Sequence, residues 1–576
     1  MIKQIIKNLV QESYKKVAVK NKWPISFIPD VSLEIPKDEQ YGDYSTTLAF
    51  SISKDIKKPP FEIATILINE MQQNLPKEIT KVELAKNGFI NFYVNKNFIQ
   101  KELGTIYKQK TKFGLSKTGK NKTIIIDYSS PNIAKPMHIG HLRSTIIGET
   151  LANLYETLGY KVIRWNCLGD WGTQFGKLIA AYKLWGDKKE VEKDPLPTLL
   201  SLYQRFHKEA KKDPSLEKRG QEEFRKLEEG DKENRKLWLW FKKESLREFN
   251  KLYDFLGIKF DVVKGESDLE KDLLPLLQEL SQKKLTQKSQ GALIFPLEQF
   301  HLPPALLQKS DGATLYLTRD LASLIERLKT YHPQRILYVV ANEQSLYFQQ
   351  LFAIAEVLKL NPGTELIHTK FGLVLDQDGK KFSTREGKLI PLQEVLEEGI
   401  NRALAIVKEK NPSWSPQKQK DTAQTIALDA LKFNDLKEYR LMDIVFAWDK
   451  MLSLKGSSSV YLQYSYARLY KILTKAGIIK GKDCTSLNQP IEITLIKKLL
   501  DFPDVIKQSA FDYSPNQLAT YLLSLADWSN RYYEKVPILK EEKTEQREAR
   551  LILIKSITIT LEKGLNILGL TALLEI

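Results

Sequence analysis

Residues 123–145 read TIIIDYSSPNIAKPMHIGHLRST, and the predicted architecture is built outward from them. TIIIDY (123–128) is a β-branched run typical of a strand buried in a parallel sheet. SSPNIAK (129–135) predicts a loop, and the apolar spacing over 137–158 predicts a helix. KVIRWNCL (161–168) predicts a second strand. Strand, loop, helix and strand in this order predict one βαβ unit of a parallel sheet.

Strands and helices alternate again further along the chain. ATLYL (313–317) predicts a strand leading into a helix from Thr318, and RILYVV (335–340) predicts another before a helix over 345–359. ELIHTKFGLVL (365–375) predicts one more strand. The alternation indicates an α/β fold of the Rossmann type, in which ligands bind beyond the carboxyl ends of the strands.

Regions on either side of this sheet differ in character. KNGFINFYV (86–94) predicts a strand in an N-terminal α+β region, and the basic segment 108–122 predicts a linker. The highly charged stretch 187–260 predicts a helical insertion outside the sheet core, and only helical patterns follow residue 390. We therefore predict an N-terminal α+β domain, a Rossmann-type domain with the insertion, and a C-terminal all-α helical bundle, over 1–115, 116–454 and 455–576.

Composition excludes several classes of protein. The 576 residues are 42% hydrophobic and 28% charged, which excludes a collagenous or wholly disordered chain. No window approaches the roughly 18 apolar residues of a membrane span, and the N-terminus lacks an apolar signal core. The two cysteines, Cys167 and Cys484, exclude a disulfide framework. We expect a cytoplasmic protein without a membrane partner.

The charge balance is strongly basic, with 88 Lys and Arg against 71 Asp and Glu, a net charge of +17. A basic excess favours a polyanionic partner such as nucleic acid. A lysine-rich solvated surface explains the same excess equally well.

Two histidines lie together where the predicted loop meets the helix. His138 and His141 share one face of the first helical turn, and Gly140 between them leaves the backbone open to a flat ring. Imidazoles and a helix N-terminus can stabilise phosphate charge as it develops. The alternatives are ordinary surface histidines or a metal site, and we discount the metal because no Glu follows in HExxH spacing.

His138-Ile139-Gly140-His141 resembles the HIGH signature of class I aminoacyl-tRNA synthetases. The residues around it, WNCLGDWGTQFGKLI (165–179), LYLTRDLAS (315–323), YVVANEQSLYFQQ (338–350) and WDKMLSLKGSSSVYLQYSYARL (448–469) resemble segments of arginyl-tRNA synthetases. The resemblance covers essentially the whole chain.

The resemblance implies an ATP site formed by two signatures. The KMSKS counterpart is Lys381-Phe382-Ser383-Thr384-Arg385, in which Thr384 stands in place of the second lysine. The resemblance implies that Lys135, just before HIGH, substitutes for that lysine. A solvated basic loop is the alternative for Lys380 and Lys381. The implied catalytic residues are Lys135, His138, His141, Lys381 and Arg385, and the implied ATP-binding residues are His138, Gly140, His141, Gly172, Lys381 and Ser383. ATP is expected as a substrate with Mg²⁺, with no resident metal and no tightly bound cofactor.

The resemblance also implies an arginine pocket, whose residues are Asp127, Ser130, Asn132, His141, Tyr316, Asp320 and Gln344. A guanidinium is planar and always charged, so carboxylates and oriented acceptors suit it. Structural roles are the alternatives for four of these residues: Asp320 as a partner of Arg319 or Arg327, Tyr316 as a core aromatic, and Asp127 and Asn132 in turn chemistry.

GDWG (169–172) follows the second predicted strand. Gly169 and Gly172 allow a nucleotide to approach the backbone, or the segment is a turn with Trp171 in the core. Cys167 is predicted to be a small buried residue and not a nucleophile.

Polar and aromatic residues outside the sheet are candidates for contacts with tRNA. The resemblance implies an anticodon-binding helical domain at the C-terminus and an extra tRNA-contacting domain at the N-terminus. The candidate residues are Asn91, Tyr461, Gln463, Tyr464, Arg468, Trp528 and Tyr533, with Arg531 beside the last two. Tyrosines packed inside an amphipathic helix, and a solvent-facing strand asparagine at residue 91, are the alternatives.

The resemblance implies an arginine–tRNA ligase that makes arginyl-adenylate from ATP and L-arginine and transfers arginine to the 3′ end of tRNA(Arg). In this family the first step usually requires bound tRNA. We expect a monomer without an editing domain. The alternatives are a class I synthetase for another amino acid and an inactive paralogue that only binds RNA.

Overall fold

The computed structural model describes residues 2–24, 30–36, 38–85, 87–380, 390–481 and 483–576. These residues form two compact units. The first unit contains residues 1–113, 468–503 and 525–560, and the second contains residues 114–467, 504–524 and 561–576. No helix among the described residues is long and apolar enough to cross a membrane.

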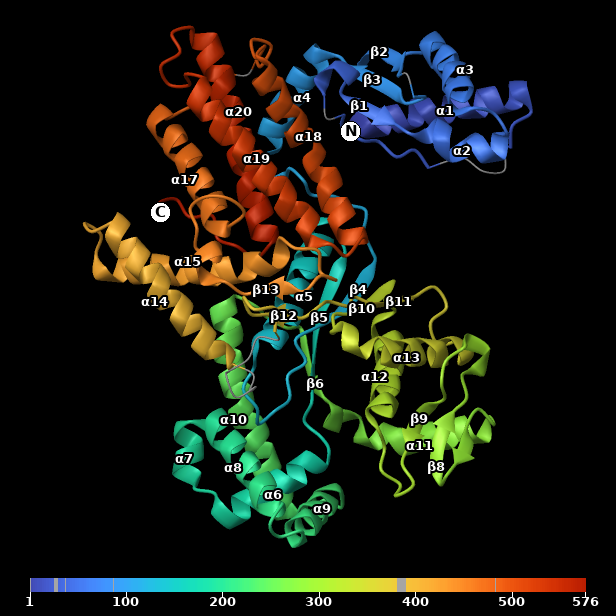
Figure 1. The fold of residues 1–576 in the computed structure, drawn as a ribbon, viewed down its shortest axis with the longest axis vertical. Coiled ribbons are helices and arrows are strands. Elements are labelled where there is room, and N and C mark those ends of the chain that lie inside the picture. Colours follow the sequence, from blue (N-terminus) through green and yellow to red (C-terminus); the bar gives the residue numbers. More distant parts are fainter. Residues whose placement is uncertain (1, 25–29, 37, 86, 381–389, 482) are drawn as a thin grey trace. The chain divides into compact units, whose positions relative to one another are not determined.

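A five-stranded parallel sheet lies at the centre of the second unit (Figure 1). Its strands, in spatial order, are β11 (Glu365–His368), β10 (Arg335–Tyr338), β4 (Thr123–Asp127), β5 (Lys161–Leu168) and β6 (Val262–Gly265). From β4 the chain adds strands first on one side and then on the other, so the strand order reverses between β4 and β10. Ligands bind beyond the carboxyl ends of the strands at such a reversal. The predicted α/β class is confirmed.

Helix α5 (Ile139–Thr157) connects β4 with β5, α12 (Tyr316–Tyr331) precedes β10, and α13 (Ser345–Val357) connects β10 with β11. The sequence predicts α5 and α13 correctly. The predicted strand over 313–317 is wrong, because α12 already begins at Tyr316. Its apolar residues follow helical spacing, since Leu317, Leu321 and Leu324 are all buried.

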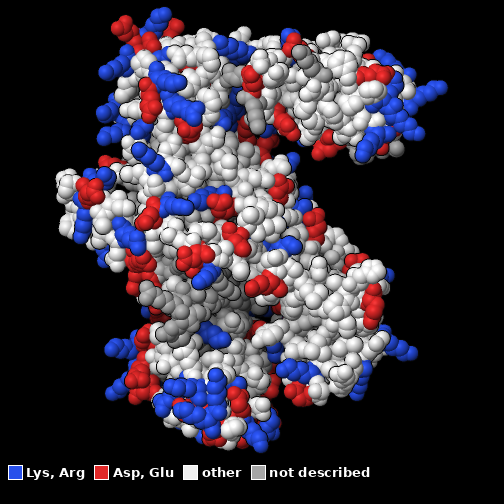
Figure 2. Space-filling view, viewed as in Figure 1, with Lys and Arg blue, Asp and Glu red and all other residues white. Residues whose placement is uncertain are grey.

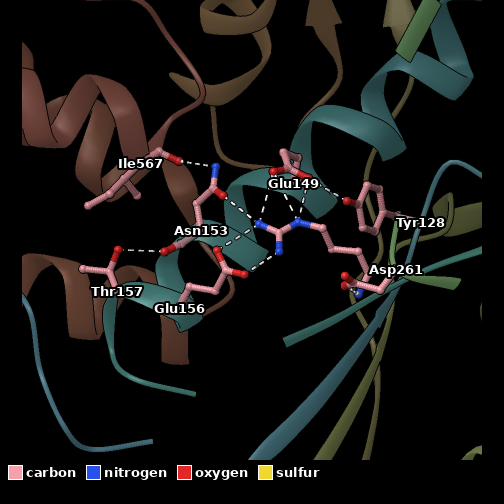
Figure 3. A network of polar contacts seen from close by, with 8 residues as sticks. Tyr128, Glu149, Asn153, Glu156, Thr157, Asp261 and Ile567 are labelled. Atoms are coloured by element: carbon pink, nitrogen blue, oxygen red, sulfur yellow. Dashed lines mark hydrogen bonds and ion pairs between the residues drawn. The ribbon is translucent and has the colours of Figure 1, made fainter. Parts of the chain in front are cut away.

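An ion-pair network fixes helix α5 against the sheet (Figure 3). The guanidinium of Arg164, on β5, contacts Glu149 at 3.1 Å and donates to Asn153 at 2.9 Å. Glu149 also accepts from the hydroxyl of Tyr128 at 2.6 Å. Asn153 in turn donates to the carbonyl of Ile567, at 3.2 Å. One arginine therefore sets the helix that carries the histidines relative to two strands.

The predicted helical insertion is present, and it has its own apolar core. Helix α6 (Thr173–Trp185) enters it, and the other helices are α7 (Lys188–Lys193), α8 (Pro195–Ala210), α9 (Ser215–Glu228) and α10 (Lys232–Leu256). Trp171, Phe206 and Phe241 lie in this core. The long helix α10 also reaches the loops at the carboxyl edge of the sheet, which the sequence does not predict.

The sequence does not predict two small sheets of the second unit. One is antiparallel, with β7 (Gln287–Ser289), β8 (Ala292–Phe295) and β9 (Ala305–Gln308), after helix α11 (Glu270–Gln282). The other pairs β12 (Val374–Leu375) with β13 (Ile444–Val445). The expectation of helices alone after residue 390 is therefore wrong at β13, a strand of two residues that is too short for a periodic signal. Helices α14 (Leu392–Lys410), α15 (Pro416–Leu436) and α16 (Trp448–Met451) precede and follow it.

The first unit contains the N-terminal α+β region. An antiparallel sheet, in the order β1 (Tyr44–Thr46), β3 (Ile90–Val94) and β2 (Ile79–Leu84), accompanies helices α1 (Ile2–Asn21), α2 (Leu48–Ile56), α3 (Pro60–Gln73) and α4 (Lys96–Gln109). The strand predicted within 86–94 is confirmed. The predicted linker 108–122 starts inside α4, and a short 3₁₀ helix follows at Lys110–Lys112.

The last part of the chain is helical, as predicted. It consists of α17 (Ser459–Ala476), α18 (Pro490–Phe511), α19 (Pro515–Lys535) and α20 (Thr544–Ile567).

Candidate active site

The two histidines form the N-terminus of helix α5. The Nδ1 atom of His138, the N-cap residue, accepts from the backbone N–H of Gly140 at 3.1 Å. The Nδ1 atom of His141 accepts from the backbone N–H of His138 at 3.2 Å. Because both Nδ1 atoms accept, both imidazoles carry their proton on Nε2. In each ring, Nδ1 takes part in capping the helix, and the Nε2–H donor does not.

The same two rings lie almost in contact, with centroids 3.9 Å apart. Burial and the neighbouring His138 lower the pKa of His141 to about 3, so this ring stays neutral. Gly140 closes the arrangement, since a Cβ there would lie only 3.0 Å from Cε1 of His138. Two paired imidazoles with fixed tautomers are not ordinary surface histidines.

The histidines line a cavity of about 310 Å³ at the carboxyl edge of the sheet, where the strand order reverses. Its lining brings together many of the predicted residues, namely Ser130, Asn132, His138, Gly140, His141 and Gln344. Arg143, Glu343 and Phe371 line it as well, and the sequence does not predict them. The cavity combines a helix N-terminus, two imidazoles and amide side chains, a set that suits a phosphate-bearing ligand.

Arg143 fixes one wall of this cavity. Its side chain, 1% exposed, contacts Asp435 at 3.2 Å and donates to the carbonyls of Leu373 at 3.0 Å and Met442 at 2.9 Å. Helix α5 is thereby bonded to the segment that leads into residues 381–385. The position of Arg143, two residues after His141, is a sequence feature that could have identified it as a cavity residue.

Asp127 ends strand β4 and is already paired. Its carboxylate contacts Arg327 at 2.6 Å and accepts from the hydroxyl of Ser130 at 3.2 Å. The guanidinium of Arg327 lies 4.4 Å from the ring centroid of Trp165. Arg327 is thus the internal partner of Asp127, and the alternative that pairs it with Asp320 is wrong.

Asp320, on the first turns of α12, accepts a hydrogen bond from the hydroxyl of Tyr347. Burial raises its pKa to about 6, against the effects of Tyr347 and Arg327. Arg319 pairs with Glu266 instead, at 3.2 Å. Within the described ranges, Asp320 therefore forms no ion pair, and it stays available for a cationic ligand.

Tyr316 begins α12 and is 55% exposed, so it is not a core aromatic. The guanidinium of Arg319 lies 5.6 Å from its ring centroid. Asp320 follows one helical turn later, so both residues lie at the start of the same helix.

Glu266 is an acidic residue of this region that the sequence does not predict. It follows strand β6 directly, and burial raises the pKa of its carboxyl to about 8, with the charges of Asp320 and Asp170 acting in the same direction. Its position after a short β-branched run, FDVVKGE (260–266), is the signal that could identify it.

Lys135 lies in the loop before the histidines. Its Nζ lies 5.2 Å from the ring centroid of Tyr203, on α8 of the insertion. The other basic candidates, Lys381 and Arg385, and Ser383 lie outside the described residues.

The GDWG segment has a structural role at Trp171. This residue is 4% exposed and packs against Phe224 and Trp238, as expected of a turn with Trp171 in the core. A Cβ on Gly169 would lie 2.1 Å from Oδ1 of Asn132, so glycine there permits two loops to meet. Gly172 has φ 124° and open space around it, but it does not line the cavity.

Cys167 is partly buried, and burial raises its pKa well above the usual value, so it stays a thiol. This agrees with the prediction that it is not a nucleophile.

The candidates for tRNA contacts in the first unit differ in exposure: Tyr533 is exposed, whereas Asn91 is buried. Arg468 donates to Asn530 at 3.2 Å and lies 4.9 Å from the ring centroid of Tyr533, which is 44% exposed. Trp528 lies 5.6 Å from the guanidinium of Arg531. Asn91 is different: it is 4% exposed, and its amide oxygen accepts from the hydroxyl of Ser45 at 2.8 Å.

Asn91 is therefore neither a solvent-facing asparagine nor open to a base in this structure. A base would reach it only after strand β1 and its Ser45 contact had shifted.

In the second unit, Tyr464 is 38% exposed, and Tyr461 is partly buried. Gln463 is 0% exposed and donates to Asp429 at 2.7 Å and to the carbonyl of Thr571 at 3.1 Å. These contacts contradict a base-reading role for Gln463, whose side chain instead fixes residues near the C-terminus. Residues 461 and 464 are three apart and therefore lie on the same face of the helix, whereas residue 463 lies on another face.

The sheet, its point of strand reversal and the histidine-capped cavity define a class I aminoacyl-tRNA synthetase. Residues 102–448 match the family described as "tRNA synthetases class I (R), catalytic domain". Residues 2–94 match "Arginyl tRNA synthetase N terminal domain", and residues 462–576 match "DALR anticodon binding domain". The chain belongs to the arginyl-tRNA synthetase family.

Relatives and solved structures agree with this assignment. The chain is 42% identical to an arginine–tRNA ligase of Pediococcus pentosaceus over 542 residues, 94% of both chains, and 42% identical to one of Enterococcus faecalis over 544 residues, again 94% of both. The arginyl-tRNA synthetase of Plasmodium falciparum superimposes with a TM-score of 0.82 at 26% identity, covering 100% of this chain and 99% of that one. The Thermus thermophilus structure, with a TM-score of 0.83 at 24% identity and full coverage of both chains, shares the fold.

Proposed function

We propose that the chain ligates L-arginine to tRNA, first forming arginyl-adenylate from ATP and then transferring arginine to the 3′ end of tRNA(Arg). The observation that carries this proposal is the His138–His141 pair at the N-terminus of α5, which lines a cavity at the carboxyl edge of the sheet. Asp320, near the start of α12, is a carboxylate that forms no ion pair within the described ranges. One edge of the sheet thus offers donors for a triphosphate and an acceptor for a guanidinium.

In the first step the arginine carboxylate attacks the α-phosphorus of ATP, and negative charge grows on the pentavalent centre and on pyrophosphate. The Nε2–H donors of His138 and His141 supply neutral hydrogen bonds to those oxygens. Lys135 supplies positive charge, and Lys381 and Arg385 are assigned the same role. Gly140 and Ser383 are assigned to ATP, as is Gly172, which does not line the cavity. Mg²⁺ bound to the phosphates of ATP would supply positive charge to neutralise them.

The arginine side is assigned to Asp127, Ser130, Asn132, Tyr316, Asp320 and Gln344, with His141 alongside. Asp320 is the strongest member, because its carboxylate is positioned by Tyr347 and forms no ion pair within the described ranges. A guanidinium would satisfy it with charge-assisted hydrogen bonds.

Contacts with tRNA are assigned to Tyr461, Tyr464, Arg468, Trp528 and Tyr533. The exposed rings of Tyr464 and Tyr533 support this assignment, because single-stranded bases stack on such rings. The domain boundaries at 1–115, 116–454 and 455–576 belong to the same proposal, as do a monomeric state and a cytoplasmic location.

The test is ATP–pyrophosphate exchange with a panel of amino acids, with and without tRNA. Exchange with arginine alone, and only when tRNA is present, is the expected result. Exchange with a different amino acid would contradict the pocket assignment. No exchange with any amino acid, together with tight tRNA binding, would identify an RNA-binding paralogue.

A His138→Ala variant separates catalysis from binding. We expect it to lose exchange and to keep its affinity for tRNA, measured by filter binding. Loss of tRNA affinity alone would contradict the role of His138 at the phosphates.

A further inference from the structure

The loop between strand β4 and the histidines has an unusual backbone. Three of its residues that are not glycine have positive φ: Ser129 at 75°, Ser130 at 47° and Ala134 at 61°. A positive φ is unfavourable for a residue that is not glycine, and it persists only where surrounding contacts hold it. The same loop carries Ser130 and Asn132 into the cavity.

Helix α10 of the insertion holds the first of these residues. The hydroxyl of Tyr253 shares a hydrogen bond of 2.7 Å with the hydroxyl of Ser129. Asn166 donates to the same tyrosine oxygen at 3.1 Å, and its amide oxygen accepts the backbone N–H of Ser130, also at 3.1 Å. Tyr253 and Ser129 are 5% and 3% exposed, so water does not compete for these bonds.

Helix α10 also holds the last of the three. The hydroxyl of Ser245 accepts the backbone N–H of Ala134 at 2.9 Å and donates to the carbonyl of Phe241 at 2.7 Å. Ser245 is 0% exposed. Tyr253 and Ser245 lie eight residues apart, about 12 Å along the helix axis, and so bind the two ends of the loop.

We propose that Tyr253 and Ser245 are positioning residues of the active site, which hold the loop over 129–134, with its left-handed residues at both ends, in the conformation that presents Ser130 and Asn132 to the substrates. Neither residue lines the cavity. This proposal rests on the proposed function, and it gives the helical insertion a task in amino-acid activation.

The decisive variant is Tyr253→Phe, which removes one oxygen and keeps the ring that packs against Phe260. We expect kcat/KM for arginine in the exchange reaction to fall at least about tenfold, because small misplacements of binding groups are costly. Tyr182→Phe is the matched control, since this tyrosine packs on Trp240 and Phe241 in the same insertion. We expect it to have the activity of the unmodified protein.

A double-variant cycle distinguishes positioning from general damage. Ser129→Gly removes both the partner hydroxyl and the cost of a positive φ. Tyr253→Phe then loses only its contact with Asn166, so it should cost less in that background than in the unmodified protein. Losses that simply multiply would overturn the proposal, as would a Tyr253→Phe variant with unchanged kcat/KM.

Two further measurements keep the outcome clear. Should Tyr253→Phe lower the yield of folded protein, Ser245→Ala tests the same loop from its other end, and unchanged kcat/KM there overturns the proposal. The unmodified chain is assayed first. If the unmodified chain shows no arginine-dependent exchange, the proposed function itself is wrong. If the unmodified chain is active and the variants have the same activity, only the proposed role of α10 is wrong.

Discussion

At the scale of single residues, the site is a set of side chains whose protonation is fixed by their neighbours. Burial beside His138 keeps His141 neutral by lowering its pKa, whereas the raised pKa values of Glu266 and Asp320 shift both carboxyls toward their protonated forms. At neutral pH, Asp320 is the carboxylate of this region that is ionised and forms no ion pair within the described ranges. If Asp320 binds the guanidinium as proposed, the affinity for arginine depends on pH.

The affinity for arginine should follow the ionisation of Asp320. The pKa of Asp320 is about 6, so the ionised form that binds a guanidinium is lost as the pH falls through 6. We expect the KM for arginine to rise on going from pH 7.5 to pH 5.5. Asp320→Asn should raise KM at both values by roughly 10- to 100-fold and remove the pH dependence at this site.

Tyr347→Phe moves the same titration. The hydroxyl of Tyr347 donates to Asp320 and lowers the pKa of that carboxyl. Without it the pKa should rise, and the midpoint of the KM-against-pH curve should move to higher pH. An unmoved midpoint would show that Asp320 does not bind the guanidinium.

Gly140→Ala tests the closeness of the histidine pair. The new Cβ would meet the His138 ring at about 3.0 Å, and the ring must shift by a few tenths of an ångström. We expect kcat to fall about 10- to 100-fold while thermal stability holds or rises, because alanine favours a helix over glycine. A fall in the melting temperature that matches the loss of activity would contradict a local effect on the histidine pair.

At the scale of elements, the sequence predicts local structure well and long-range contacts poorly. The strand, loop and helix over 123–158 are predictable because their signals lie within one short segment. The contacts of Tyr253 with Ser129, and of Tyr203 with Lys135, cross gaps of 124 and 68 residues and leave no periodic trace.

Prediction also fails for particular side chains in elements that are otherwise correct. The helix that contains Gln463 is predictable, but an amphipathic pattern with polar residues on several faces does not show that this side chain binds Asp429 inside the fold. Family resemblance identifies His138 and Asp320, whereas Glu266 requires the positions of the strand ends.

Glycines determine how closely two insertion helices approach. A Cβ on Gly176, in α6, would lie 2.2 Å from the backbone carbonyl of Gly220 in α9. We expect Gly176→Ala to lower the free energy of unfolding by about 1–3 kcal/mol, measured by urea denaturation. Gly220→Ala is the matched control, because its Cβ would first meet Cγ of Lys177, at 2.9 Å, instead of a carbonyl at 2.2 Å, and it should cost less.

At the scale of the whole molecule, the excess of positive charge favours binding of tRNA, a polyanion. Figure 2 shows Lys and Arg over the N-terminal domain and over the helical insertion, where Asp and Glu lie among them. Each phosphate contact releases counterions, so binding that depends on these charges weakens with salt.

The net charge of +17 predicts a strong dependence of tRNA binding on salt. The Kd for tRNA should rise at least about tenfold between roughly 50 and 200 mM salt. The KM for arginine should change much less, since a partly buried ion pair is screened weakly. A tRNA affinity independent of salt would show that the basic surface does not bind the polyanion.

Helix α5 connects the histidine pair with the C-terminal end of α20. It is a stiff rod about 28 Å long, with the two imidazoles at its first residues and Asn153, bonded to the carbonyl of Ile567, toward its other end. Ile567 is the last residue of α20. A helix moves as a nearly rigid body, so we expect a displacement of that carbonyl to change the orientation of both histidines together. The last residues of α20, which belong to the second unit as α5 does, are therefore expected to influence the first chemical step.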